Sequence, residues 1–273
     1  MIARLRVLCA LAVLAGLTVS PSAAASPPGA LAFGGLQRTY LVHAPAGPVT
    51  GLVINLHGAG HNGAIQKDIT GYDRVADQFG FVVAYPDGID MSWADGRGAS
   101  VPDRQGVDDV GFLSALIGRL STEYAVPPGR VFVTGLSAGA FMANRLACDR
   151  ADLVSAIAPV AGTLGAGVGC VPSRPVSVLM IHGTADPVVP FGGGPMVGRG
   201  GPSTILSAPA TAERWRQADG CGPFVEQAAA GPVQLASASG CAAGAQVVLA
   251  RVNGGGHDWL DASQATGQFF AAR

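Results

Sequence analysis

Charged residues are scarce in this 273-residue chain: they make up 13% of it, and the formal net charge at pH 7 is −1. No run of lysine or arginine occurs, which argues against a nucleic-acid partner or an anionic membrane surface. The sequence also lacks the H-E-x-x-H pattern, and no cysteine or histidine spacing fits zinc, so we expect no metal and no cofactor. No internal repeat and no appended carbohydrate-binding or polymer-binding module is recognisable.

Apolar residues and glycine are abundant instead. Hydrophobic residues make up 49% of the chain, and there are 40 glycines. This composition indicates a buried core with glycine-lined loops rather than disorder.

The first 25 residues have the pattern of a signal peptide. A short basic start precedes an almost wholly apolar segment at 7–19, and alanines at 23–25 offer a cleavage site. The apolar segment is too short for a membrane anchor. We therefore predict a secreted, monomeric mature chain of residues 26–273, whose length suits one domain.

Four cysteines remain beyond this leader: Cys148, Cys170, Cys221 and Cys241. Secretion into an oxidising compartment predicts that an even number of cysteines is paired. Three connectivities are open from the sequence. Pairing of nearest neighbours, Cys148 with Cys170 and Cys221 with Cys241, is favoured because each pair brackets a short stretch, and each bond would contribute about 3 kcal/mol.

The motif G-x-S-x-G stands at 135–139, directly after the apolar run 131–133 and before a helix-compatible run at 140–147. A strand, this turn and a helix in succession are typical of a nucleophile elbow. A Cβ atom at either glycine would crowd the neighbouring strand and helix. The pattern predicts Ser137 as a nucleophile above a helix N-terminus.

The base follows by elimination. In hydrolases with this elbow the chain order is serine, acid, histidine, and only His182 and His257 follow Ser137. His182 ends the apolar run 176–181, so we interpret it as structural. His257 follows the strand-like run 246–252 and three glycines, from which a loop can reach back over the sheet, and we predict it as the base.

Asp186 is the predicted orienting acid because it alone leaves a core strand directly, at the carboxyl edge where such sites lie. Asp258 adjoins His257, but neighbouring side chains seldom face each other on a loop. Five other acids also fall between the serine and the histidine: Asp149, Asp152, Glu213, Asp219 and Glu226.

Two backbone N–H groups should stabilise the oxyanion. One is predicted at Ala138, immediately after the nucleophile. The other should come from the glycine-rich loop 57–63 after the strand-like run 52–56, and we choose Ala59. His57 is interpreted as shaping this loop.

Three aromatic residues, Trp93, Phe191 and Trp259, are expected on loops at the same edge. We predict them as substrate contacts, because an exposed aromatic ring can hold an acyl group or a sugar by its apolar face. The alternative is that each covers core residues.

The rest of the chain alternates strands and helices, which predicts a mostly parallel sheet flanked by helices. Residues 192–201 resemble a mobile loop after the acid. Acids at 108 and 109 are expected to favour the dipole of a helix that ends at 124. Further strands are expected at 38–43 and 81–85, and further helices at 64–80 and 263–271.

Several motifs together resemble one family. LHGAG, YPDG followed by SWADG, VDDVGFL, GLSAGAFMANRLAC, HGTADPVVPF and GGGHDW occur in the order found in secreted esterases of the polyhydroxybutyrate depolymerase and feruloyl esterase group. The resemblance covers residues 35–259. It implies an α/β-hydrolase fold, carboxylic ester hydrolysis and a triad of Ser137, Asp186 and His257. Leu260 departs from the proline that often follows the tryptophan, so the loop beyond the base is expected to differ.

The substrate stays open at this point. The resembling group includes enzymes that act on polyesters, on feruloylated or acetylated plant polysaccharides and on simple esters. A polyhydroxybutyrate depolymerase, a serine peptidase of the same fold and a binding protein with an inactive hydrolase core are the alternatives.

Overall fold

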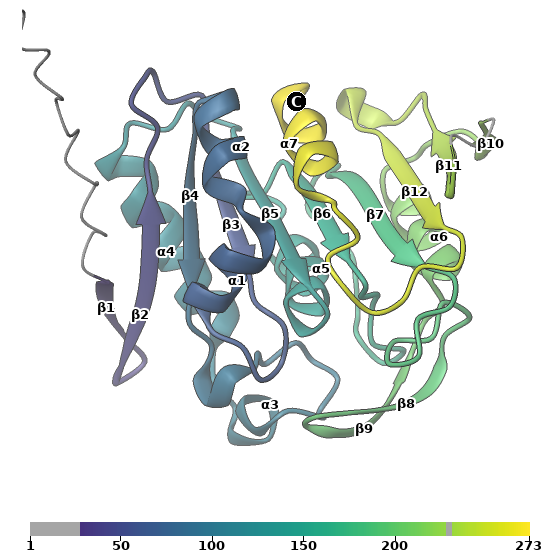
Figure 1. The fold of residues 1–273 in the computed structure, drawn as a ribbon, viewed down its shortest axis with the longest axis horizontal. Coiled ribbons are helices and arrows are strands. Elements are labelled where there is room, and N and C mark those ends of the chain that lie inside the picture. Colours follow the sequence, from purple (N-terminus) through teal and green to yellow (C-terminus); the bar gives the residue numbers. More distant parts are fainter. Residues whose placement is uncertain (1–27, 228–230) are drawn as a thin grey trace, which may run out of the picture.

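Ten strands form one sheet in the computed structural model, which describes residues 28–227 and 231–273 (Figure 1). The predicted signal peptide lies outside the described residues. In sheet order the strands are β1 (Gly29–Phe33), β2 (Leu36–His43), β4 (Phe81–Pro86), β3 (Gly51–Leu56), β5 (Val131–Leu136), β6 (Ala156–Val160), β7 (Ser177–Gly183), β12 (Val247–Val252), β11 (Val233–Ala238) and β10 (Val225–Glu226).

The six strands from β4 to β12 run parallel, and the two outer strands on each side are antiparallel. Strands β3 to β7 are buried along their whole length, which explains their continuous apolar runs. The prediction of a mostly parallel sheet is confirmed. Its carboxyl ends lie at the lower edge in Figure 1.

Helices cover both faces of the sheet and leave an apolar core on each side. In Figure 1 α1, α2 and α7 lie in front, with α4, α5 and α6 behind and α3 at the lower edge. The helices are α1 (Gly63–Thr70), α2 (Tyr72–Phe79), α3 (Val101–Gln105), α4 (Asp109–Glu123), α5 (Ala138–Asp149), α6 (Ala208–Ala218) and α7 (Ser263–Ala271), with 3₁₀ turns η1 (Ile89–Met91) and η2 (Ala242–Gly244).

The single helix predicted over 64–80 is wrong, because two helices meet at Gly71. This glycine has φ +53°, and its N–H donates to the Lys67 carbonyl at 2.8 Å, which closes α1 with a left-handed cap. Ile65 and Ile69 of α1 are exposed.

Asp108 and Asp109 begin α4 as predicted, but Asp109 does more than favour the helix dipole. Asp108 accepts from the Gly111 N–H at 2.7 Å as the N-cap. The carboxylate of Asp109 is buried, pairs with Arg38 at 2.6 Å and accepts from the Ala94 N–H at 2.7 Å. This ion pair ties the start of α4 to β2 and to the loop after η1.

The segment 192–201, predicted as a loop, belongs to a β-hairpin. Strand β8 (Gly194–Gly198) pairs antiparallel with β9 (Gly201–Ile205), and Arg199 and Gly200 form the turn. This hairpin and α3 lie beyond the carboxyl ends of the parallel strands (Figure 1).

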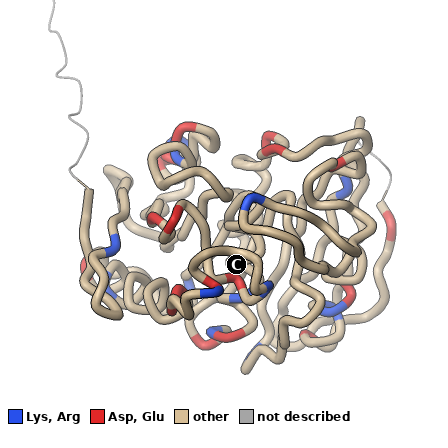
Figure 2. Tube along the Cα trace, turned by 90° about the horizontal axis from the view of Figure 1, so that it is seen from below, with Lys and Arg blue, Asp and Glu red and all other residues tan. Residues whose placement is uncertain are grey.

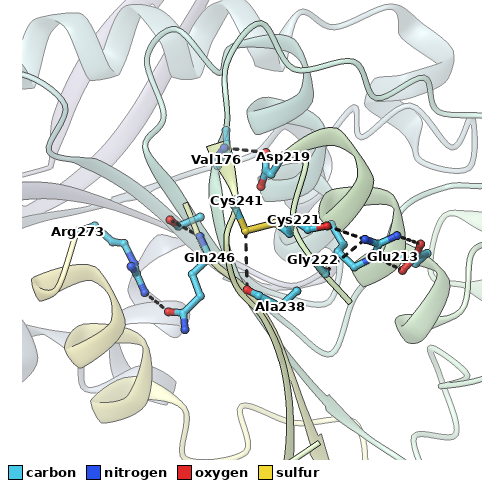
Figure 3. Close-up of a disulfide and its surroundings, with 11 residues drawn as sticks. Val176, Glu213, Asp219, Cys221, Gly222, Ala238, Cys241, Gln246 and Arg273 are labelled. Atoms are coloured by element: carbon cyan, nitrogen blue, oxygen red, sulfur yellow. Dashed lines mark hydrogen bonds and ion pairs between the residues drawn. A yellow bond between two sulfur atoms is a disulfide. The ribbon is translucent and has the colours of Figure 1, made fainter. Parts of the chain in front are cut away.

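Both predicted disulfides are present. Cys148 at the end of α5 bonds to Cys170, and Cys221 after α6 bonds to Cys241 (Figure 3). Beside the second bond, burial raises the pKa of Asp219 to about 6, although its carboxylate accepts from the Val176 N–H at 3.1 Å.

Arginines and the one lysine of the sequence, Lys67, lie interspersed with acidic residues over the fold (Figure 2). Among the described residues, no helix is both long and apolar enough to cross a membrane.

Candidate active site

Ser137 occupies a strained turn between β5 and α5. Its φ of 55° and ψ of −114° lie outside the regions that serine ordinarily adopts. A Cβ atom at Gly135 would lie 2.7 Å from the Gly139 carbonyl carbon, and one at Gly139 would lie 2.2 Å from the Leu56 carbonyl oxygen. The two glycines of the motif are therefore required because backbone passes within contact distance of both.

The structure brings the three predicted polar residues together. The Ser137 Oγ lies 3.0 Å from the His257 Nε2, and the His257 Nδ1 lies 2.8 Å from the Asp186 Oδ2. An Nδ1–H that donates to the carboxylate leaves Nε2 as an acceptor for the serine hydroxyl. The arrangement has the geometry of a nucleophile, a base and an orienting acid.

The Asp186 side chain is buried, and its other oxygen is also used. Oδ1 accepts from the N–H groups of Val188 and Val189, each at 2.8 Å. Burial alone would raise the pKa of this carboxyl, but hydrogen bonds from His257, Val189 and Val188 outweigh it and hold the pKa below its usual value. Asp258 instead accepts from the Leu260 N–H at 2.6 Å.

His182 lies beneath the acid and supports its loop, in keeping with the structural role predicted for it. Its Nε2–H donates to the Val189 carbonyl at 2.9 Å and lies 3.5 Å from the Asp186 Oδ2. Burial lowers the pKa of His182, so the ring is neutral at neutral pH.

Ala59 lies on the loop after β3, and Ala138 directly follows the serine at the start of α5. Ala138 is the first residue of α5, where an N–H has no acceptor within its own helix. Within the described residues, the Ala59 N–H has no protein acceptor either. Both alanines line the same cavity as Ser137 and His257, so both donors are available to a ligand.

This cavity has a volume of about 370 Å³. Its floor is the elbow and the loop after β3, and its outer wall is the β8–β9 hairpin. The other side chains that line it include His61, Ser92, Arg97, Phe141, Val188, Met196 and Arg199.

The three predicted aromatic contacts are not among the residues that line this cavity. Trp93 is fully buried, and its indole N–H donates to the His57 carbonyl at 2.9 Å. Trp259 is buried, and its indole N–H donates to the Ser263 Oγ at 2.7 Å. Phe191 packs edge-on against His182. Trp93 and Trp259 are buried away from this cavity, which contradicts their prediction as substrate contacts. Phe191 is half-buried and does not line the cavity, and its contact with substrate stays a prediction.

His57 shapes the loop that carries Ala59, as predicted. Its Nδ1–H donates to the Gly58 carbonyl at 2.8 Å, and its Nε2 accepts from the Gly88 N–H at 2.9 Å. The ring also packs against Trp93, with 4.7 Å between ring centroids. Burial lowers the pKa of His57 from 6.5 to about 4, and protonation would remove the acceptor for Gly88.

We expect this histidine to make folding pH-dependent. Above pH 6.5 the ring is neutral in both states, and as pH falls toward about 4 only the unfolded chain takes up the proton. The free energy of unfolding should therefore decline over this range by roughly 3 kcal/mol from this group. Urea unfolding of wild type and His57→Gln between these pH values measures it. The variant should show the shallower decline, and parallel curves would contradict the assignment.

Several residues of the cavity wall were not predicted from the sequence. Phe141 could have been found, because it stands one helical turn after Ser137, on the face of α5 that follows the elbow. Met196 and Arg199 belong to the β8–β9 hairpin, which was not predicted because the glycines of this segment are typical of a loop. Among the described residues, no group of three or more metal-ligating side chains is gathered to hold an ion.

Comparisons with known proteins agree with the fold and the motifs. Residues 38–191 match the family described as esterase PHB depolymerase. The chain is 32% identical over 245 residues to NocK, a candidate esterase of Nocardia uniformis subsp. tsuyamanensis, covering 82% of this chain and 71% of NocK. It is 32% identical over 232 residues to feruloyl esterase B of Piromyces equi, covering 81% of this chain but only 42% of that enzyme.

Among solved structures, an acetyl xylan esterase from Aspergillus awamori superimposes with a TM-score of 0.66 at 17% identity, over 86% of this chain and 94% of that one. This likeness shows the fold alone. The class is therefore that of the α/β-hydrolases. Within that class, the chain belongs to the esterase PHB depolymerase family, and carboxylic ester hydrolysis is the chemistry that fits it.

Proposed function

We propose that this chain is a serine esterase that forms an acyl-enzyme on Ser137. The observation that carries the proposal is the hydrogen-bonded series from Asp186 through His257 to Ser137. It lies at the floor of a cavity that is also lined by Ala59 and Ala138, whose N–H groups have no acceptor in the described part of the chain. A binding protein with an inactive core would have no need for this alignment. The strained backbone at the serine supports the same role.

The proposed reaction has two acyl-transfer steps. His257 takes the hydroxyl proton at Nε2 while the Ser137 Oγ attacks the ester carbonyl carbon, and the N–H groups of Ala59 and Ala138 donate to the oxyanion. Collapse of the intermediate breaks the bond to the alcohol oxygen, which takes the proton from His257. Water then attacks the acyl-enzyme and gives a proton to the His257 Nε2. Collapse of this second intermediate breaks the acyl bond to the Ser137 Oγ, which takes the proton back from His257, and the acid is released.

Short or soluble esters are the proposed substrates. The cavity of about 370 Å³ suits a small acyl or alcohol group next to the serine. Trp93 and Trp259 were predicted to hold an acyl group or a sugar, but both are buried, so they give no reason to favour an aromatic acyl group. Feruloyl esterase B is a relative by name, and feruloyl, acetyl and short hydroxyalkanoate esters all stay within the proposal.

A substrate panel tests this proposal. We expect turnover of p-nitrophenyl acetate and of at least one of methyl ferulate, acetylated xylan and hydroxybutyrate oligomers, with little clearing of crystalline polyester granules and no cleavage of a peptide p-nitroanilide. Anilide cleavage that outpaces ester turnover would indicate the peptidase instead. Rapid clearing of granules without activity on methyl ferulate would favour the depolymerase, and no turnover at all would favour the binding protein.

Secretion, a single domain over 26–273 and a monomeric state remain proposals. The two disulfides support export to an oxidising compartment, where such bonds persist.

A further inference from the structure

The turn of the β8–β9 hairpin brings one arginine to the mouth of the cavity. Arg199 lines the cavity wall, and its Cδ lies 3.5 Å from the position that a Cβ atom on Gly60 would occupy. Gly60 follows Ala59, the proposed oxyanion donor. Arg199 is therefore next to the loop that would hold the reacting carbonyl.

The two side chains with a permanent charge among the described residues that line this cavity are both arginines. Among the described lining residues there are two arginines and two histidines but no aspartate or glutamate. One of the histidines, His61, has an Nδ1 that is buried from solvent and has no hydrogen-bond partner within the described chain.

The two arginines differ in how many of their guanidinium N–H donors are already hydrogen-bonded within the described chain. Arg97 donates Nε and Nη2 to both oxygens of Asp95, at 2.9 and 2.7 Å, and its guanidinium stacks 3.7 Å from the centroid of the Phe141 ring. Its charge is paired and its position is fixed by packing. Arg97 is thus part of the wall rather than a free ligand-binding group.

Arg199 is only partly paired. Its Nη1 donates to the Asp90 carbonyl at 2.7 Å and lies 3.4 Å from the Asp90 Oδ2, on the exposed side of the turn. The structure records no acceptor for its Nε or Nη2 among the described residues. Asp90 therefore orients the guanidinium, while further N–H donors remain for a ligand.

We propose that Arg199 is a specificity-determining residue that binds a carboxylate carried by the ester, so that the enzyme prefers acidic esters to neutral ones. The inference rests on the proposed esterase function. A guanidinium recognises a carboxylate through paired N–H donors and opposite charge. The free end of a hydroxyalkanoate oligomer and the monoester of a dicarboxylic acid both carry such a group near the scissile bond.

The carboxylate can stand on either side of the ester, and two matched pairs of substrates distinguish the sides. For the acyl side, monomethyl glutarate is compared with methyl 5-methylhexanoate, in which two methyl groups replace the carboxylate oxygens. For the alcohol side, 3-acetoxybutyrate is compared with 4-methylpentan-2-yl acetate. The readout is the ratio of kcat/KM for the acidic ester to that for its neutral isostere, at pH 7.5.

In the wild-type enzyme we expect a ratio above about ten in at least one pair. Arg199→Gln should lower that ratio roughly tenfold, mainly through KM for the acidic ester, and leave the neutral ester within about twofold. Arg199→Lys should keep part of the preference, because it retains the charge but not the paired donors. About 0.5 M NaCl should reduce the wild-type ratio, and it should have little effect in Arg199→Gln.

Arg214→Gln is the matched control, since it removes an exposed arginine of α6 away from the cavity and should leave both ratios unchanged. Ratios near one in both pairs, with all four esters hydrolysed, would overturn the acidic preference while the esterase proposal stands. A high ratio that Arg199→Gln and Arg199→Lys leave intact would overturn the role of Arg199. No hydrolysis of any of the four esters, or of p-nitrophenyl acetate, would overturn both proposals.

Discussion

The Ser137→Ala variant is expected to lose about five to six orders of magnitude in kcat on p-nitrophenyl acetate, the loss typical when a catalytic serine is removed. In the wild-type chain the Ser137 Oγ lies 3.0 Å from the His257 Nε2. The substitution removes this oxygen and therefore the nucleophile that is aligned with the base. The substitution removes one oxygen and adds no atom, so the packing around Gly135 and Gly139 should be preserved. Steady-state turnover and circular dichroism of both proteins measure the effect and the fold.

Ser92→Ala is the control for this prediction. Ser92 lines the same cavity but has no contact with His257, so its loss should change kcat by less than about tenfold. Mass spectrometry after incubation with an activated ester should show an acyl adduct on wild type and none on Ser137→Ala. More than a tenth of wild-type activity in a folded Ser137→Ala protein would rule out Ser137 as the nucleophile.

The juxtaposition of Ser137, Asp186 and His257 could be predicted because the common edge of the parallel strands and the chain order of the fold leave few candidate residues. Each of the three follows a strand of the parallel part of the sheet, and such strands end at one common edge. The chain order of the elbow fold then left two candidate histidines. Of these, His182 ends β7 inside the core, where its ring supports Val189.

The aromatic contacts could not be predicted in the same way. Residue type placed Trp93 and Trp259 on loops near that edge, but it did not determine which way each ring would turn. Trp93 turns inward because its N–H donates to the His57 carbonyl and its ring packs against the His57 imidazole. Only the three-dimensional arrangement supplies these partners.

The cavity wall depends on contacts that are far apart in the sequence. Arg199 reaches the Asp90 carbonyl across 109 residues, and Arg97 approaches the Met196 Sδ across 99. Glycines at 192–194, 198, 200 and 201 suggested a loop, yet the segment around them pairs as β8 and β9. Local sequence patterns therefore located the candidate catalytic residues better than the residues of the cavity wall.

Asp186→Asn is expected to lower kcat by roughly four orders of magnitude while the protein stays folded. The amide oxygen can still accept from the N–H groups of Val188 and Val189, so the loop after β7 should keep its shape. The amide nitrogen, however, would donate to the His257 Nδ1, and this forces the ring proton onto Nε2. A protonated Nε2 can no longer accept the hydroxyl proton of Ser137. Turnover and thermal unfolding of the variant separate these two effects.

Asp258→Asn is the matched control for this change, because Asp258 adjoins the same histidine in sequence and accepts only from the exposed Leu260 N–H in the described chain. Its kcat should stay within about tenfold of wild type. A mild loss in Asp186→Asn combined with a severe loss in Asp258→Asn would assign the orienting carboxylate to Asp258. Asp186 is buried above His182, and its two oxygens accept three hydrogen bonds. A carboxylate held in this way fixes one tautomer of His257. We therefore expect the severe loss in Asp186→Asn and the mild one in Asp258→Asn.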